Sequence, residues 1–443
     1  TPNPKPQTPN PKPQTPSVAS KGKVYMNQGD EGEKSWRLKQ IIGGDNREEM
    51  TEDDQITTIE FSPWGDYMAI GDNAGRIIVF EKGKGSEEYV FLTELQAHSK
   101  FFDYFRSMYI APRINSLQWI RPLGKSHLFL TATEKSINLC RSTEKLGKVY
   151  EPVNTDCSDV AGLIMPKAKV DEQATWHSSV IRHYPKLHSH IINSVSLCAN
   201  HSEFLSADEL NVYMWNIETA IKAYPILEFR SIEEDAPEVI TAAKFSPVEE
   251  HVYLISTTKC AHLADTRKPT HNLKKTLRFE EPVLKRNVFT EYLNAVNSST
   301  FAEPGKIITR EPLQTKVWDI RVTNKPLTVI PLYDGLKHKL AEMVENDYIF
   351  DRFNVVSSPC GKRHATGLYQ NTFHILDNTG NTNLQVMMSW KKATRVRTIP
   401  KGPPEAVPDN WDFELKTLRL AWHTTENIIA VPNEGAIFVY KLE

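Results

Sequence analysis

The chain repeats one pattern of apolar and polar positions along most of its length. The first copy begins at Ile56 and reads ITTIEFSPWGDYMAIGDNAGRIIVFE. Runs of β-branched and aromatic residues, each of strand length, alternate there with turns that contain Pro, Gly, Asn and Asp. Each copy therefore predicts three short antiparallel strands joined by tight turns.

Six further copies begin at Ile114, Ile192, Ile240, Leu293, Phe353 and Leu415. Their spacing exceeds the ~40–45 residues of a typical WD repeat, and the excess falls between copies, where loops are inserted. The endings VYMWNI and TKVWDI match the Trp-Asp position of that repeat. One copy alone buries too little surface, whereas seven in a ring bury every sheet face. We therefore predict an all-β, seven-bladed WD-repeat β-propeller over residues 34–443 rather than three β-sandwiches.

Both ends of this ring have recognisable sequences. Residues 35–43, SWRLKQIIG, alternate like an outer strand and are predicted to pair with the blade containing 415–441. Residues 1–33 contain the unit TPNPKPQ twice and the start of a third. Proline removes amide donors, and few apolar positions offset the entropy lost on ordering. A disordered Pro-rich tail is predicted there, with a Pro-rich recognition ligand as the alternative.

Three insertions between copies are candidates for binding, because loops on a rigid scaffold carry sites more often than the scaffold does. Residues 82–113 contain the apolar run YVFLTEL and are predicted to form an extended hairpin arm, with a loop folded back on the propeller as the alternative. Residues 391–410 are basic and then Pro-rich, which indicates a solvated loop or a weak basic docking site. Residues 142–190 contain His177, His183, His188 and His190. Without acids or cysteines at matching spacing, loop histidines are favoured there over a zinc site.

Composition narrows the classes of function. Lys+Arg number 53 against 55 Asp+Glu, so the basic excess of a bulk nucleic-acid binder is missing. The five scattered cysteines form no CxxC and no Cys/His pair at ligand spacing, so free thiols in a reducing compartment are expected. No apolar run approaches the ~18 residues of a membrane span, and no signal-peptide core opens the chain. We expect a cytoplasmic protein, with the nucleus as a further location.

Catalytic signatures are missing from the sequence. It contains no GxSxG, GxxxxGK[ST], HExxH or GxGxxG motif. The segment GDNAG at 71–75 lacks a histidine that would ligate a metal, and it lies in a hairpin turn. Propellers are mostly rigid platforms. A non-enzymatic binding platform without metal or cofactor is expected.

Several longer segments add a family resemblance. They are GDYMAIGDNAGRIIVF, FFDYFRSM, FLSADELNVYMWN, EVITAAKFSP, TKVWDI, VENDYIFDRF and AWHTTENIIAV. Collinearly over about residues 35–443, they resemble the propeller-type regulatory B subunit of protein phosphatase type 2A. The resemblance implies a chain without catalytic activity that joins a helical-repeat scaffold subunit and a metal-dependent catalytic subunit. It also implies that the arm and one face meet the scaffold, while an acidic face holds basic segments of phosphoserine and phosphothreonine substrates. The alternative is a WD-repeat scaffold of another complex.

The same resemblance implies a set of substrate-binding residues. They are Asp208, Glu209, Phe289, Glu345, Asp347 and Arg352. In VENDYIFDRF, residues 344–353, alternate positions of an extended segment would point Glu345 and Asp347 the same way, toward one basic peptide. Glu209 stands where the family usually has Asp, and Arg352 replaces a Lys. Surface acids that merely keep a strand soluble are the alternative.

Overall fold

The computed structural model describes residues 35–43, 51–83, 85–124, 126–150, 168–219, 222–228, 238–268, 276–282, 288–389, 395–399 and 411–443. Within it, Trp36–Glu443 form one compact unit. The Pro-rich tail predicted over residues 1–33 lies outside the described residues.

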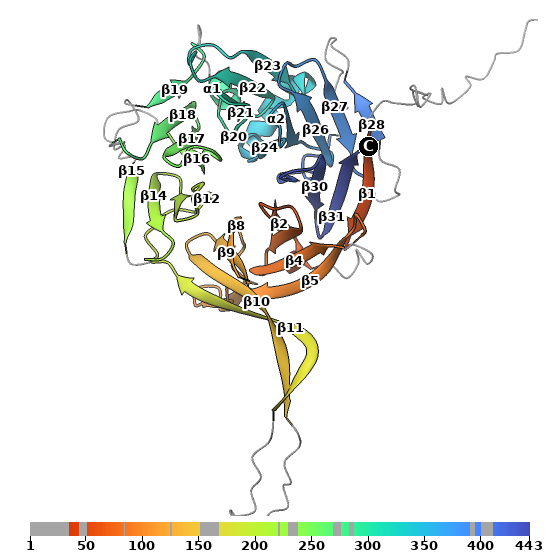
Figure 1. Ribbon diagram of the computed structural model, residues 1–443. Coiled ribbons are helices and arrows are strands. Elements are labelled where there is room, and N and C mark those ends of the chain that lie inside the picture. Colours follow the sequence, from red (N-terminus) through yellow and green to blue (C-terminus); the bar gives the residue numbers. More distant parts are fainter. Residues whose placement is uncertain are drawn as a thin grey trace, which may run out of the picture. The chain divides into compact units, whose positions relative to one another are not determined.

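Seven antiparallel sheets stand around a ring as the blades of a propeller, which confirms the predicted fold (Figure 1). Blade 1 comprises β2 (Ile56–Phe61), β3 (Tyr67–Asp72), β4 (Arg76–Lys82) and β5 (Tyr89–Gln96). Blade 2 comprises β8 (Ser116–Leu123), β9 (Ser126–Ala132), β10 (Ile137–Tyr150) and β11 (Ala168–His183). Blade 3 comprises β12 (Ser194–Leu197), β13 (Glu203–Ala207), β14 (Asn211–Asn216) and β15 (Ala223–Glu228).

The other four blades continue in chain order. Blade 4 comprises β16 (Ile240–Phe245), β17 (Val252–Thr257), β18 (Ala261–Asp265) and β19 (Leu277–Phe279). Blade 5 comprises β20 (Ser298–Phe301), β21 (Lys306–Arg310), β22 (Gln314–Asp319) and β23 (Thr328–Pro331). Blade 6 comprises β24 (Val355–Ser357), β25 (Arg363–Gly367), β26 (Thr372–Asp377), β27 (Asn383–Met387) and β28 (Arg395–Thr398). Blade 7 comprises β29 (Ala421–Trp422), β30 (Ile428–Asn433), β31 (Ala436–Leu442) and β1 (Trp36–Ile42).

Short helices occupy the connections. They are η2 (Glu52–Asp54), α1 (Val288–Leu293), η5 (Asp334–Lys339), α2 (Leu340–Glu345) and η6 (Tyr348–Phe350). None of the helices in the described part of the chain is long and apolar enough to span a membrane.

The hydrophobic core lies between neighbouring blades. One cluster, for example, combines Leu205 and Val212 of blade 3 with Phe245 and Tyr253 of blade 4. Successive side chains of a strand point to opposite faces of its sheet, and in a propeller each face packs against one of the two neighbouring blades. This arrangement explains why the inner strands carry nearly continuous apolar runs, such as the fully buried stretch of β30.

The predicted ring closure is confirmed. β1 pairs antiparallel with β31, from Trp36 opposite Leu442 to Ile42 opposite Ile437. The Trp36 side chain is 3% exposed and meets Trp422 edge to face at 5.7 Å between ring centroids. The first described strand thus completes the last blade.

The insertion at 82–113 differs from the prediction of an extended arm. Its apolar run YVFLTEL belongs to β5, the outer strand of blade 1, because the run alternates and pairs with β4. Only a short hairpin follows, β6 (Phe101–Asp103) paired with β7 (Met108–Ile110). The long hairpin arises from β10 and β11, whose pairing continues from Asn138 opposite His183 to Tyr150 opposite Ala168. Beyond Thr143 and His177 it extends past β9, and we call this extension the hairpin arm (Figure 1).

The basic insertion at 391–410 also contributes to a blade. Within it the structure describes residues 395–399, and Arg395–Thr398 form β28, which pairs with β27 as a fifth strand of blade 6. This part is therefore an edge strand rather than a solvated loop. The alternating sequence RVRT is compatible with an edge strand that is charged toward solvent.

Strand direction assigns the loops to two faces. In a four-stranded antiparallel blade, the second and fourth strands run in the same direction. The turns after the second strands and the connections from blade to blade therefore lie on one face, which we call the inter-blade face. The turns after the first and third strands lie on the opposite face. The hairpin arm joins a third strand to a fourth and so belongs to that opposite face.

Candidate functional site

The segment VENDYIFDRF lies on the inter-blade face, in the connection from blade 5 to blade 6. It is not extended, which corrects the prediction made from its sequence. Glu345 ends α2, Asp347 adopts a left-handed backbone with φ 61°, and η6 follows. Both carboxylates belong to exposed residues, and neither has an ion pair among the described residues. The two acids thus flank a helix end and do not share a strand face.

Apolar residues anchor this segment and explain its irregular pattern. Leu340, Met343 and Val344 have the spacing of one helical face, and Met343 is buried. Ile349 and Phe353 are buried in the same cluster. Because the segment changes from helix to turn within ten residues, its sequence follows neither the period of two of a strand nor the 3.6-residue period of a helix.

The third acid of the segment, Asp351, faces inward. Its Oδ1 atom lies 2.7 Å from Lys416 Nζ, and its Oδ2 atom accepts a hydrogen bond of 3.1 Å from the Tyr369 hydroxyl. The same hydroxyl lies 2.8 Å from the Tyr348 carbonyl oxygen, so its single proton is shared between the two acceptors. Asp351 therefore fixes the segment, which leaves Glu345 and Asp347 as its outward negative charges.

Glu209 and Arg352 are brought together across the ring. Glu209 lies in the turn between β13 and β14, and its Oε1 atom is 3.5 Å from Arg352 Nη2. The two side chains are 37% and 35% exposed, respectively. Burial lowers the pKa of Arg352 more than the carboxylate of Glu209 raises it. The distance between the two charged groups is long and both side chains are partly exposed, so a competing cation can reach Glu209.

Asp208 does not belong to this surface, which corrects the sequence-based assignment. Its side chain is fully buried, with 0% exposed. Its carboxylate lies 2.9 Å from His188 Nδ1 and accepts hydrogen bonds from the Leu210 and Asn211 amides at 2.8 and 2.6 Å. Burial raises the pKa of Asp208, but these hydrogen bonds outweigh it and leave the pKa below its ordinary value.

The network behind Asp208 extends through blade 3. An ionised carboxylate only accepts, so His188 donates through Nδ1, and Nε2 faces Ser206 Oγ at 2.6 Å. Ser206 in turn accepts from Trp215 Nε1 at 2.7 Å. A Trp-Ser-His-Asp chain thus connects the sheet to the turn that carries Glu209. The sequence signal was available, because Trp215 is the Trp of the WD-like segment VYMWNI.

Phe289 lies on α1, in the connection between blades 4 and 5. Further along this helix, Tyr292 meets Phe350 of η6 edge to face at 5.6 Å. Phe350 itself is exposed. The backbone position of Phe289 is therefore next to the VENDYIFDRF segment.

An exposed aromatic hairpin lies on the inter-blade face, inside the 82–113 insertion for which the sequence predicted a longer arm. β6 and β7 belong to the connection between blades 1 and 2, and they present Phe101, Phe102, Tyr104, Phe105, Met108 and Tyr109 to solvent. Phe102 packs edge to face against Tyr104 and Tyr109, so the rings support one another. Contiguous exposed apolar residues mark interaction sites. The non-alternating run FFDYFRSMYI was the available signal.

The four histidines of the second insertion do not gather. His188 belongs to the network of Asp208, His183 Nδ1 lies 2.8 Å from Asn138 Oδ1, and His190 Nδ1 lies 3.0 Å from Ser189 Oγ. His177 lies on β11. In the described residues, none of the four belongs to a group of metal-ligating side chains. The structure thus gives His183, His188 and His190 separate hydrogen-bond partners.

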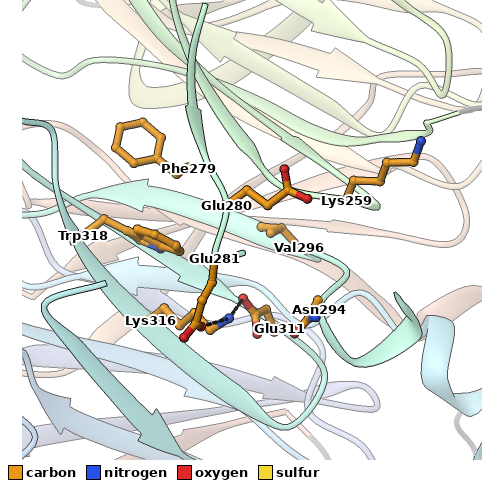
Figure 2. Close-up of a pocket in the computed structure, with 9 residues that line it drawn as sticks. All are labelled: Lys259, Phe279, Glu280, Glu281, Asn294, Val296, Glu311, Lys316 and Trp318. Atoms are coloured by element: carbon orange, nitrogen blue, oxygen red, sulfur yellow. Dashed lines mark ion pairs between the residues drawn. The ribbon is translucent and has the colours of Figure 1, made fainter. Parts of the chain in front are cut away.

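A small pocket between blades 4 and 5 is lined by charged side chains that pair with one another (Figure 2). Lys316 Nζ lies 2.9 Å from Glu311 Oε1 and 3.3 Å from Glu281 Oε2. The volume of about 30 Å³ holds only a few water molecules. This pocket is too small for a peptide or a cofactor.

Comparison with known proteins identifies the family. The chain is 30% identical over 452 residues to the regulatory B subunit of protein phosphatase PP2A from Schizosaccharomyces pombe, covering 92% of this chain and 97% of that protein. It is also 30% identical over 439 residues to the 55 kDa regulatory subunit of protein phosphatase PP2A from Drosophila melanogaster, covering 93% and 87%. The chain belongs to the 55 kDa regulatory B subunits of protein phosphatase 2A.

Other B subunits agree with this assignment. The B beta isoform of the 55 kDa regulatory subunit of protein phosphatase 2A from Arabidopsis thaliana is 28% identical over 499 residues, covering 94% of this chain and all of that protein. No protein-family model matches the sequence. Because the relatives are named as regulatory subunits, the chain has a regulatory rather than a catalytic role in protein phosphatase 2A.

Proposed function

We propose that this chain binds the scaffold and catalytic subunits of protein phosphatase 2A and selects phosphoproteins that carry basic segments. The observation that carries the proposal is the pair of exposed acids, Glu345 and Asp347, that lack ion-pair partners among the described residues. Glu209 adds a third acid whose contact with Arg352 is loose. These acids attract a basic peptide.

The energetics require several acids to act together. An exposed charge pair contributes only about 0.2–1 kcal/mol, so one carboxylate does not hold a substrate. Complementary charge also speeds the encounter, and the effect weakens as salt is added. The aromatic hairpin β6–β7 lies on the same face and offers apolar contact that salt does not screen.

A charge reversal on the inter-blade face tests substrate selection. In the reconstituted holoenzyme, Glu345→Lys/Asp347→Lys is expected to lower kcat/KM for a basic phosphopeptide about tenfold, from about 1.4 kcal/mol of lost attraction. An otherwise identical neutral phosphopeptide should change little. Initial dephosphorylation rates at low and high salt provide the measurement.

The control reverses the charge of two acidic residues on the opposite face. Glu249→Lys/Glu250→Lys makes the same change in net charge at exposed residues of the turn between β16 and β17, on the opposite face. It should leave the preference for the basic peptide unaltered. Equal losses in both double variants would contradict a local acidic site and indicate a general charge effect.

We propose that the hairpin arm binds the scaffold subunit. It projects beyond the ring and belongs to the face opposite the acids (Figure 1). One chain can therefore contact the scaffold subunit and a substrate at the same time. Its described part is a two-stranded ladder that continues past β9, with a register shift between Leu146 and Lys148.

Shortening the arm tests this assignment. Replacing residues 144–176 by a short Gly-containing turn keeps the pairing of Thr143 with Ser126 and His177, and therefore all four strands of blade 2. The variant should melt like the wild type yet lose binding to the scaffold–catalytic dimer by at least about tenfold. Pull-down and titration of the purified dimer measure this loss, and unchanged binding would reject the arm as the scaffold contact.

A further inference from the structure

A second group of reactive side chains lies in blade 4, away from the exposed acids. Glu238 precedes β16, Cys260 precedes β18, and His262 lies on β18. The His262 Nε2 atom is 3.1 Å from Cys260 Sγ and 3.4 Å from Glu238 Oε1, and Sγ is 3.6 Å from that same oxygen. In the described part of the chain, this is the group of three metal-ligating residues whose donor atoms converge.

The donor atoms have the separations that a tetrahedral zinc ion needs. Zinc bonds of about 2.3 Å to sulfur, about 2.05 Å to nitrogen and about 2.0 Å to oxygen give donor separations of roughly 3.3–3.6 Å. The two separations that involve the carboxylate, 3.4 and 3.6 Å, match these values within about 0.1 Å, whereas the 3.1 Å between sulfur and nitrogen is shorter by about 0.5 Å. An ion can therefore enter with only a small movement of Cys260 relative to His262.

The local strand geometry produces this arrangement. Cys260 and His262 are two residues apart, and side chains at that spacing along an extended chain point to the same face. This Cys-x-His spacing differs from the helical and turn spacings of common ligand motifs, which explains why the sequence predicted no ligand pair here. Glu238 is brought alongside because Val239 donates its amide to Thr258 Oγ1 at 3.1 Å.

The surroundings also hold the ligands in place. His262 Nδ1 lies 2.9 Å from the Thr276 hydroxyl, the outer-shell hydrogen bond that typically orients a metal-bound imidazole. Thr257 Oγ1 donates to Glu238 Oε1. Cys260 and His262 are buried, and the Glu238 side chain is only 11% exposed, so the site is largely shielded from solvent.

Charge balance favours a divalent cation. A thiolate, a carboxylate and a neutral imidazole together carry the two negative charges that neutralise one dication. The neighbouring cation Arg278 is held by Glu280, with 2.7 Å between Nε and Oε2. Burial raises the pKa of Cys260 to about 12, so the metal has to displace the thiol proton on binding.

We propose that Glu238, Cys260 and His262 bind one zinc ion, with water as the fourth ligand. Mixed sulfur, nitrogen and oxygen donors suit zinc, and three protein ligands leave one open position. The ion would fasten the chain before β16 to β18. The Ile240 amide donates to the Glu209 carbonyl oxygen at 2.8 Å, so this connection is next to the turn that carries an acid of the inter-blade face.

Metal titration of the full chain tests the site. After removal of metal by a chelator, the protein is titrated with Co²⁺ and then with Zn²⁺, and the absorption bands of thiolate-bound cobalt are followed. One equivalent of Co²⁺ should give these bands, and Zn²⁺ should abolish them. Cys260→Ser should lose the bands, His262→Ala should weaken binding by more than about 100-fold, and Thr276→Val by about 10- to 100-fold.

Two controls separate metal binding from misfolding. Cys198→Ser changes a buried cysteine of blade 3 outside the group and should bind Co²⁺ like the wild type. Alkylation of the exposed Cys360 before the titration should leave the cobalt bands of the wild type unchanged, because this thiol lies outside the group. Absence of cobalt bands in the wild type, or bands that persist in Cys260→Ser, would overturn the proposal.

Discussion

Deletion of residues 1–44, which removes β1, is expected to abolish cooperative folding of the propeller. The strand supplies the outer edge of blade 7 through its pairing with β31, and it buries Trp36 against Trp422. A single buried Trp→Ala substitution costs about 3–5 kcal/mol, and a whole domain is stable by only about 5–15 kcal/mol. Loss of the strand also leaves β31 as an unpaired edge, which promotes association between chains.

The control for this deletion is a chain that begins at residue 35 and retains β1. It lacks only the Pro-rich sequence and should show the thermal transition of the full chain. Circular dichroism during heating measures the loss, and size-exclusion chromatography detects association through the exposed edge. A sharp, unchanged transition in the chain that lacks β1 would contradict the role of this strand in closing the ring.

The fold was predictable because its information is local and repeated. Each copy contains apolar strands of the right length between turns that require Gly, Asn or Asp, and all seven predicted starts lie at or shortly before the first strands of blades. The fourth strands were less visible. YVFLTEL was assigned to an arm, although its alternation fits an outer strand with one face toward solvent. The true arm begins as an ordinary third strand, and only pairing beyond Thr143 distinguishes it.

The candidate site was less predictable because it depends on which way neighbouring side chains point. Asp208 and Glu209 are adjacent acids, and the sequence alone does not say that one completes a buried network while the other reaches solvent. VENDYIFDRF was assigned to an extended chain because the helical face begins earlier, at Leu340. The convergence of Glu238 with Cys260 and His262 depends on how the chain before β16 is held beside the turn between β17 and β18.

Asp208→Ala is expected to destabilise the protein by about 3 kcal/mol, whereas Glu209→Ala should change stability by less than about 0.5 kcal/mol. The first substitution leaves His188 Nδ1 and the amides of Leu210 and Asn211 without their acceptor in a buried site. The second removes only a half-exposed contact with Arg352. Urea unfolding of both variants measures the difference between these adjacent acids.

The pH dependence of the Asp208 effect has a defined sign. Hydrogen bonds hold the pKa of Asp208 below its ordinary value in the folded state despite burial, so the carboxylate binds its proton more tightly when the chain is unfolded. Its contribution is therefore fully present above the unfolded pKa of about 3.9 and is lost as pH falls through the folded pKa. The stability gap between wild type and Asp208→Asn should narrow below about pH 4. A gap that stays constant in acid would mean that Asp208 acts through shape and neutral hydrogen bonds, and that its charge does not stabilise the turn carrying Glu209.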